Sequence, residues 1–189
     1  MQDIKILSRQ VLSDKVYRLE LIKLSQSNKG KTEIHEREVY FRPEGAAIFL
    51  YNPDENKVLL TKQFRVPVYL KGIGDVILEV CAGIIDGDEH PNEAIIREVE
   101  EETGYRISAV NRVAEGFMTP ASVSEYVYFF TGEYSAEMKI NEGGGVDPGE
   151  DIELEELSFA EVRDLLFSGK LRDIKTILLL QHAIINNLI

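Results

Sequence analysis

Short apolar segments alternate with polar turns over the first forty residues, and this pattern predicts a group of strands. The apolar positions are interrupted at Ser13-Asp14, and a polar turn at 25–31 precedes a further candidate strand at 32–41. We expect these strands to form a small N-terminal β lobe that covers residues 1–42 and leads into a second domain, residues 43–189.

Two firmer strands follow at 45–51 and 58–64, and the residues between them favour a turn. The linking sequence Asn52-Pro53-Asp54-Glu55-Asn56 is rich in residues that form turns, so we expect the pair to make a β-hairpin. A short strand at 77–80 then leads into an acidic loop.

The segment from about Pro91 to Thr103 predicts a helix, because proline suits the first turn of a helix and Gly104 suits its end. After it, the pattern predicts strands at 107–117, 127–134 and 152–157 and helices at 159–167 and 173–188. Strands on both sides of one helix, with helices at the C-terminal end, indicate an α+β sandwich.

The chain has 189 residues, a net charge of −12 and one cysteine, and these features argue against several classes of function. Binding to a nucleic-acid backbone rests on basic surfaces, which an acidic chain does not favour. A single cysteine, Cys81, allows no internal disulfide, which fits the reducing cytoplasm. No apolar run has the length of a signal peptide or of a membrane span, so we expect a cytoplasmic protein with no membrane partner.

Glutamates are concentrated on the predicted helix at 91–103. Glu98 and Glu102 are four residues apart and share a face, and Glu101 flanks that face. Like charges at this spacing destabilise a helix by about 0.2–0.5 kcal/mol per pair, a cost that a bound cation would offset. Because Mg²⁺ binds carboxylates together with substrate phosphates, the pattern predicts a metal site for phosphate chemistry. The alternative is a solvated acidic face with no ligand.

The region from Gly83 to Tyr105 fits a longer pattern of fixed residues. Gly83 is followed by five residues, Glu89, seven residues and then the run Arg97-Glu98-Val99-Glu100-Glu101-Glu102-Thr103-Gly104. This resembles the Nudix box, Gly-x5-Glu-x7-Arg-Glu-U-x-Glu-Glu-x-Gly-U, where U is a bulky aliphatic residue. Every fixed residue is present, and Tyr105 departs from the aliphatic residue at the last position. The resemblance to the Nudix hydrolases implies an α/β/α sandwich with a mixed sheet and cleavage of nucleoside diphosphates linked to another group.

The resemblance also implies a set of metal ligands. Glu98 and Glu102 would bind Mg²⁺, or Mn²⁺ in its place, with Glu101 as an accessory ligand. The backbone carbonyl of Ala82 matches a further ligand position in related nucleotide-sugar enzymes. Metal ions in such sites neutralise phosphate oxygens and lower the pKa of the attacking water.

Other residues in and beside the box are expected to have supporting roles. Glu89 is expected to assist through a bridging water, and Arg97, which we place on a different helix face from the glutamates, to hold the loop through a salt bridge. Cys81 is interpreted as a small buried packing residue and His90 as an exposed cap of the helix.

A second acidic group is needed as the catalytic base or as another metal ligand, and the glycine-rich segment 143–153 is the candidate source. Loops of this composition are commonly functional, and movement of this one would close the site over the substrate. We choose Glu150 as ligand or base, with Glu153 second. The alternative is a flexible acidic turn without a role.

Motifs outside the box resemble the nucleoside-diphosphate-sugar hydrolases, a Nudix group that includes ADP-ribose pyrophosphatases. They are Gln63-Phe64-Arg65, the run from Glu79 to Gly83, and Pro120. Around Pro120 the chain reads Thr-Pro-Ala-Ser where this group usually has Ser-Pro-Gly, which predicts an altered substrate loop.

A likeness to the bacterial GDP-mannose pyrophosphatases of this group runs along most of the chain, through segments 35–40, 62–66, 81–83, 101–105, 143–146 and 171–180. That group forms homodimers in which the N-terminal β lobe helps to build the partner's active site. The resemblance therefore implies a homodimer with substrate contacts from the neighbouring subunit through Glu36, Arg37 and Glu38. It implies further substrate contacts through Arg65, Glu125 and Lys175.

We therefore expect Mg²⁺-dependent hydrolysis of the diphosphate bond of a nucleotide sugar. GDP-mannose, which would give GMP and mannose 1-phosphate, is the leading substrate, and ADP-ribose is the second candidate. Pro148 and Gly149 depart from the more acidic loop of the GDP-mannose group and leave the base and sugar preference open. The alternative from another class is a Nudix-like module that senses a nucleotide sugar without cleaving it.

Overall fold

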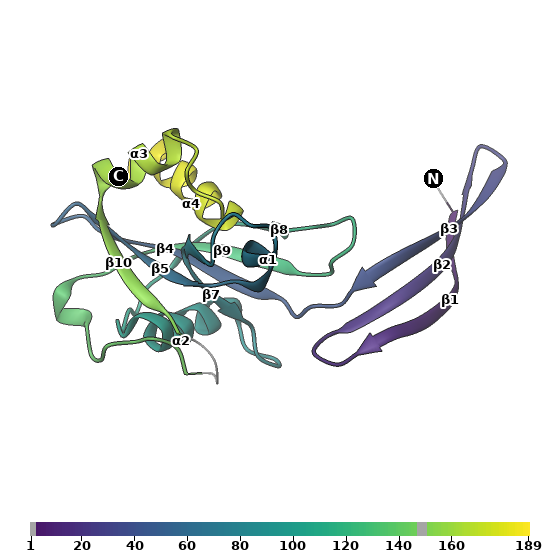
Figure 1. The fold of residues 1–189 in the computed structure, drawn as a ribbon, viewed down its shortest axis with the longest axis horizontal. Coiled ribbons are helices and arrows are strands. Elements are labelled where there is room, and N and C mark those ends of the chain that lie inside the picture. Colours follow the sequence, from purple (N-terminus) through teal and green to yellow (C-terminus); the bar gives the residue numbers. More distant parts are fainter. Residues whose placement is uncertain (1–2, 147–150) are drawn as a thin grey trace. The chain divides into compact units, whose positions relative to one another are not determined.

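The computed structural model describes residues 3–146 and 151–189, and the chain divides into two compact units (Figure 1). The first unit comprises the N-terminal segment through Glu44 together with Gly116–Val127. The second comprises Gly45–Glu115 and Tyr128–Ile189. The first unit thus contains a later segment that the sequence pattern had placed in the second domain.

The first unit is built on a three-stranded antiparallel sheet in the order β1-β2-β3. Its strands are β1 (Asp3–Asp14), β2 (Arg18–Asn28) and β3 (Lys31–Tyr40). Lys29 and Gly30 between β2 and β3 both have positive φ, at 49° and 79°, as a two-residue hairpin turn of type I′ requires. The predicted strands are therefore confirmed, but the polar turn predicted at 25–31 is shorter, because β2 continues to Asn28 and leaves only Lys29 and Gly30 for the turn.

The register of this sheet decides which side chains share a face. Ile6 lies opposite Leu24 and Val11 opposite Glu20, so these residues of β1 and β2 are on one face. Ile6 and Val11 remain more than half exposed, with 56% and 52% of their surface accessible. The first unit thus presents apolar side chains on a face of its sheet.

The later segment of the first unit joins the end of β3. Tyr40 and Val123 form a parallel bridge, and Tyr40 exchanges backbone hydrogen bonds with Ser122 at 2.8 Å and Ser124 at 3.0 Å. The Arg42 guanidinium, just after β3, lies 4.6 Å from the centre of the Tyr17 ring.

The second unit contains a seven-stranded sheet with the strand order β10-β5-β4-β9-β8, in which β6 pairs with β5 and β7 with β4. Its strands are β4 (Gly45–Asn52), β5 (Lys57–Phe64), β6 (Val76–Glu79), β7 (Cys81–Ile84), β8 (Asn111–Phe117), β9 (Tyr126–Glu133) and β10 (Glu153–Ser158). The last residues of β8, from Gly116, and the first residues of β9, through Val127, are grouped with the first unit. Strands β4 and β5 pair as an antiparallel hairpin, as predicted.

Helices cover both faces of the central sheet. The α-helices of the described residues are α1 (Val66–Leu70), α2 (Pro91–Thr103), α3 (Phe159–Phe167) and α4 (Ile174–Ile185). Figure 1 shows α2 on one face of the sheet and α3 and α4 on the other. The predicted α+β class and α/β/α sandwich are therefore confirmed.

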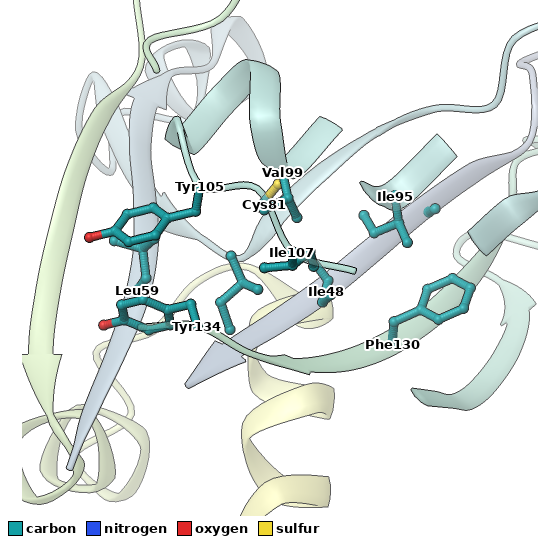
Figure 2. Close-up of a cluster of buried hydrophobic side chains, with 11 residues drawn as sticks. Ile48, Leu59, Cys81, Ile95, Val99, Tyr105, Ile107, Phe130 and Tyr134 are labelled. Atoms are coloured by element: carbon teal, nitrogen blue, oxygen red, sulfur yellow. The ribbon is translucent and has the colours of Figure 1, made fainter. Parts of the chain in front are cut away.

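The core that supports α2 consists of apolar side chains from the helix and from the sheet below it (Figure 2). Ile95 and Val99 of α2 pack with Ile48, Leu59 and other buried residues of the sheet. The Tyr105 and Tyr134 rings meet edge to face, with 5.0 Å between their centres. Tyr105, which departs from the box pattern, is thus a core residue. No helix in the described part of the chain is long and apolar enough to span a membrane.

Candidate active site

Helix α2 carries the acidic residues of the box, and both its ends are capped as the sequence predicted. His90 is an exposed N-cap whose side chain accepts a hydrogen bond from the Asn92 backbone, and Glu93 completes a capping box. Gly104 ends the helix in the left-handed conformation, at φ 74°. The buried residues Ile95 and Val99 anchor the helix to the core and so fix the direction of its glutamates.

Glu102 is a buried carboxylate, with 4% of its surface exposed, that lies against β7. It accepts a hydrogen bond from the Ala82 backbone N–H at 3.2 Å and another from the Cys81 thiol. The pKa of Glu102 is raised to about 8. Burial is the largest cause and the charge of Glu98 adds to it, while Cys81, Ala82 and Arg65 act in the opposite direction.

Glu98 lies against the backbone of Gly83 in β7. A Cβ atom built on Gly83 would be 1.9 Å from Cδ of Glu98, so only glycine leaves room for the carboxylate here. The predicted ligands Ala82, Glu98 and Glu102 therefore come together where α2 packs on β7.

These groups fit a hard divalent cation. Two carboxylates lie beside the backbone of Ala82 and Gly83, and one of them, Glu102, is buried with a raised pKa that a bound cation would lower. Within residues 3–146 and 151–189, no three His, Cys, Asp or Glu side chains are grouped so that they could hold a metal. Glu150, predicted as ligand or base, lies outside the described residues.

Arg97 connects the acidic loop to the acidic helix. Its guanidinium donates to Glu89 at 2.9 Å and to the Ile84 carbonyl at 3.1 Å, which confirms the expected salt bridge to the loop. It also donates to Glu98 at 2.9 Å and to Glu101 at 3.0 Å. The prediction that Arg97 lies on a different helix face from the glutamates was wrong, because Glu101, four positions ahead, shares its face and the long side chain of Arg97 also reaches Glu98.

The hydrogen bond from Arg97 fixes the position of the Glu89 side chain at this site. That bond, together with the charge of Arg97, lowers the pKa of Glu89 against the opposing effect of burial. The expected role of Glu89 through a bridging water stays a prediction.

Two residues of the glycine-rich segment cap the C-terminal end of α2. The N–H groups of Gly144 and Gly145 donate to the carbonyls of Glu102 and Glu101 at 2.8 and 3.1 Å. The segment that was predicted to supply a further acidic ligand or base therefore begins at the end of α2, the helix that carries the predicted metal ligands. Glu153, at the other end of this segment, begins β10 with a largely exposed side chain 3.7 Å from Lys62.

Arg65 and Lys175 meet at a buried carboxylate, Glu79, to which the sequence analysis had given no role. Glu79 accepts from Arg65 Nε at 2.8 Å and from Lys175 Nζ at 3.4 Å. Asp173, also missed, accepts from Lys175 at 2.7 Å. Glu79 ends the β6 strand within a motif already noted for its family likeness, which was the signal available in the sequence.

The remaining predicted substrate residues belong to the first unit, and three of them, Glu36, Arg37 and Glu38, are consecutive residues of β3 whose side chains alternate between its faces. Cross-strand pairing puts Arg37 on the same face as Ile22, and Glu36 and Glu38 on the opposite face. Glu125 lies 3.1 Å from Arg42 Nε. The substrate roles of these residues stay predictions.

Comparison with known proteins agrees with this geometry. The NUDIX domain family matches residues 41–180. A GDP-mannose pyrophosphatase of Pectobacterium atrosepticum is 42% identical over 184 residues, which cover 96% of this chain and 94% of that protein. A GDP-mannose pyrophosphatase of Escherichia coli O157:H7 is 40% identical over 190 residues, which cover 100% of this chain and 98% of that protein.

A solved structure described as an ADP compounds hydrolase has the same fold, with a TM-score of 0.73 and 21% identity over 94% of this chain and 90% of that one. The family match covers most of the chain, including α2 and β7, and the relatives match it from end to end. The chain therefore belongs to the Nudix family and is a Nudix hydrolase.

Proposed function

We propose that this enzyme hydrolyses the diphosphate bond of a nucleotide sugar in a Mg²⁺-dependent reaction, with GDP-mannose as substrate and GMP and mannose 1-phosphate as products. The observation that carries the proposal is the near full-length identity of about 40% to proteins named GDP-mannose pyrophosphatase. In this chain, Glu102 lies beside Ala82 and Glu98 beside Gly83, the next residue, and the charges of the two carboxylates interact.

Each described group at the site has a chemical task in this proposal. Glu98, Glu102 and the Ala82 carbonyl would hold Mg²⁺, which when bound neutralises phosphate oxygens and acidifies water. Arg65 and Lys175 supply positive charge to the diphosphate, which an acidic protein needs at its site. A carboxylate of segment 143–153, with Glu150 before Glu153, takes the proton of the attacking water.

Arg97 restrains the ligands in this proposal. Its simultaneous contacts with Glu89, Glu98 and the Ile84 carbonyl connect the acidic loop to the helix, so the carboxylates keep one arrangement before substrate arrives. Such preorganisation avoids reorganisation during the reaction.

The test is a hydrolysis assay over a panel of nucleotide sugars, including GDP-mannose and ADP-ribose, with Mg²⁺ and with EDTA. Phosphorus NMR of the products should show a nucleoside monophosphate and a sugar phosphate. Release of inorganic phosphate alone, or turnover unchanged by EDTA, would contradict the proposal. Preference for ADP-ribose would retain the reaction class and replace the substrate.

The variant Glu102→Gln separates an enzyme from a sensor of nucleotide sugars. It keeps the shape of the side chain but removes a metal-binding charge, so turnover should fall by about two orders of magnitude or more. If the wild type binds GDP-mannose without cleaving it, and the variant binds equally well, the chain is a sensor.

We also propose a homodimer that forms through the first unit. The three-stranded sheet of this unit leaves apolar side chains exposed, and a sheet of this size has little core of its own. In the dimer, Glu36, Arg37 and Glu38 would contact the substrate bound by the neighbouring subunit.

A further inference from the structure

Glu79 is a buried carboxylate held between two cations. Its side chain is 6% exposed, and each of its oxygens faces a different partner. Oε2 accepts from Arg65 Nε at 2.8 Å, and Oε1 accepts from Lys175 Nζ at 3.4 Å. Because a buried charge with a missing partner is strongly destabilising, this carboxylate restrains both cations.

The contact with Glu79 leaves the terminal nitrogens of the Arg65 guanidinium available to bind a ligand. Glu79 accepts from Nε, and within residues 3–146 and 151–189 no hydrogen bond involves the terminal nitrogens of Arg65. The Arg65 side chain is 43% exposed, so its guanidinium is fixed on the protein side and open on the solvent side. Two adjacent terminal N–H groups in one plane suit bidentate binding of a phosphate.

Lys175 is restrained by the same carboxylate and by the first turn of α4. Asp173 accepts from Lys175 at 2.7 Å and also from the backbone and hydroxyl of Thr176 at 2.9 and 2.7 Å. Thr176 in turn accepts from the Val80 backbone at 2.8 Å, which ties α4 to the residue after Glu79. Burial lowers the pKa of Lys175, but Asp173 and Glu79 raise it by more, so the amine stays charged.

Arg65, one of the two cations at Glu79, interacts electrostatically with the carboxylates that we expect to bind the metal. The charge of Arg65 lowers the pKa of Glu102, the buried carboxylate at Ala82. A diphosphate held by the metal carboxylates would therefore be within the field of Arg65.

We propose that Glu79 is a positioning residue for the substrate diphosphate, which orients Arg65 through one oxygen and Lys175 through the other. The inference rests on the proposed function, because it needs Arg65 and Lys175 to bind phosphate. The alternative role for Glu79 is charge balance, in which the carboxylate only neutralises the positive charge of Arg65 and Lys175. A carboxylate that only balanced charge would weaken the attraction for an anionic substrate, whereas a positioning carboxylate increases affinity.

The two roles predict opposite results for Glu79→Gln and Glu79→Asp. If Glu79 positions the cations, Glu79→Gln should raise KM for GDP-mannose about tenfold or more, the usual effect of losing a charged hydrogen bond, and change kcat far less. Glu79→Asp should also raise KM, because its shorter side chain cannot reach both cations. Calorimetric Kd values in EDTA, where no turnover occurs, should rise in parallel.

Charge balance alone would give a lower KM for Glu79→Gln and a wild-type KM for Glu79→Asp, and either result would overturn the proposal. Glu156→Gln is the matched control, since it removes a carboxylate paired with Lys57 at 3.4 Å and with Tyr134 at 3.0 Å on β10. It should leave KM unchanged. An equal rise of KM in this control would show a general effect of lost charge and would also overturn the proposal.

A double-mutant cycle connects the effect to Arg65. Arg65→Lys keeps the positive charge but lacks Nε, the atom that Glu79 holds, so Glu79→Gln should raise KM by a smaller factor in that background than in the wild type. The rise that remains is the share that acts through Lys175. If the two substitutions raise KM independently, so that their factors multiply in the double variant, Glu79 does not act through Arg65. Thermal melting of every variant shows whether the fold is retained.

The assays also separate failure of this inference from failure of the proposed function. If the wild type cleaves a nucleotide sugar and both Glu79 variants keep its KM, only the inference fails. If the wild type neither binds nor cleaves any member of the panel, the proposed function fails and the role of Glu79 in binding a diphosphate fails with it.

Discussion

At the scale of single residues, Gly83 makes room for the carboxylate of Glu98. In Gly83→Ala the new methyl group would lie 1.9 Å from Cδ of Glu98, so the carboxylate must move from its place against residue 83. We expect the Mg²⁺ concentration for half-maximal rate to rise by about tenfold or more, the scale of losing one good ionic contact. The measurement is the rate of nucleotide-sugar hydrolysis as a function of Mg²⁺ concentration.

Gly116→Ala is the control for this substitution. A Cβ atom at Gly116 would meet no atom within 4 Å, and its φ is not positive, so the variant adds the same methyl group without displacing a neighbour. A normal Mg²⁺ dependence is expected. If Gly83→Ala behaves like Gly116→Ala, the carboxylate of Glu98 does not hold the metal where we place it.

The raised pKa of Glu102 predicts how the stability of the metal-free protein depends on pH. The carboxyl group titrates at about 8 in the folded chain and at its ordinary value of 4.5 in the unfolded chain. Between these values the folded state binds the additional proton, so the free energy of unfolding should decrease as pH rises. The contribution across this range is on the order of a few kcal/mol.

Urea unfolding in EDTA at pH 5 and pH 8 measures this contribution. Glu102→Gln cannot titrate, while its amide oxygen can still accept from the Ala82 backbone, so its stability should decrease less over the same range. Parallel pH profiles for the wild type and the variant would show that Glu102 ionises normally in the folded protein.

Sequence reasoning located Glu98 and Glu102 but missed Glu79, and the reason is physical. The two helical glutamates are four residues apart, and in a helix this spacing places them on one face, so the pattern is visible in the sequence alone. Glu79 is one carboxylate at the end of a short strand, with partners 14 positions before it and 96 after it. Only the packing of β6 against β5 and α4 brings them together, and no local periodicity encodes that.

At the scale of elements, the end of α2 depends on Gly104. Its φ of 74° is strained for residues with a side chain, and a Cβ atom there would lie 2.2 Å from the backbone oxygen of Asn141. We expect Gly104→Ala to lower the free energy of unfolding by about 1–2 kcal/mol for the conformation and by about 1–3 kcal/mol for the clash. Chemical denaturation measures the sum.

Gly169→Ala isolates the conformational part. Gly169 also has positive φ, at 66°, but a Cβ atom there would meet nothing within 4 Å. This variant should therefore lose about 1–2 kcal/mol and no more. Equal losses in the two variants would mean that the segment at Asn141 moves aside freely and does not restrain the helix.

The same scale shows where sequence patterns predict an element and where they do not. The bounds of α2 were predicted correctly because proline, the cap residues and glycine mark both ends. Strand β7 was not predicted, since its four residues include Gly83 and form a strand through pairing with β4. Helix α1 was also missed, because its five residues are too few to show a helical period.

At the scale of the whole molecule, the exposed apolar face of the first unit predicts the oligomeric state. Ile6 and Val11 share this face, whereas Gln10 lies opposite Leu21 on the other face. In a monomer, Ile6→Lys would be a surface substitution that changes the free energy of unfolding by about 0.5 kcal/mol or less. In a dimer that buries this face, it would place a charge in an apolar interface, which is costly without a partner.

Light scattering coupled to gel filtration should give twice the 21.4 kDa mass of one chain for the wild type and for Gln10→Lys, and a single-chain mass for Ile6→Lys at low protein concentration. If Glu36, Arg37 and Glu38 serve the neighbouring subunit, the monomeric variant should also lose nucleotide-sugar hydrolysis, because its carboxylates Glu98 and Glu102 remain but the partner's residues are absent. A wild type that elutes as a single chain with full activity would remove both the dimer and the substrate roles of these three residues.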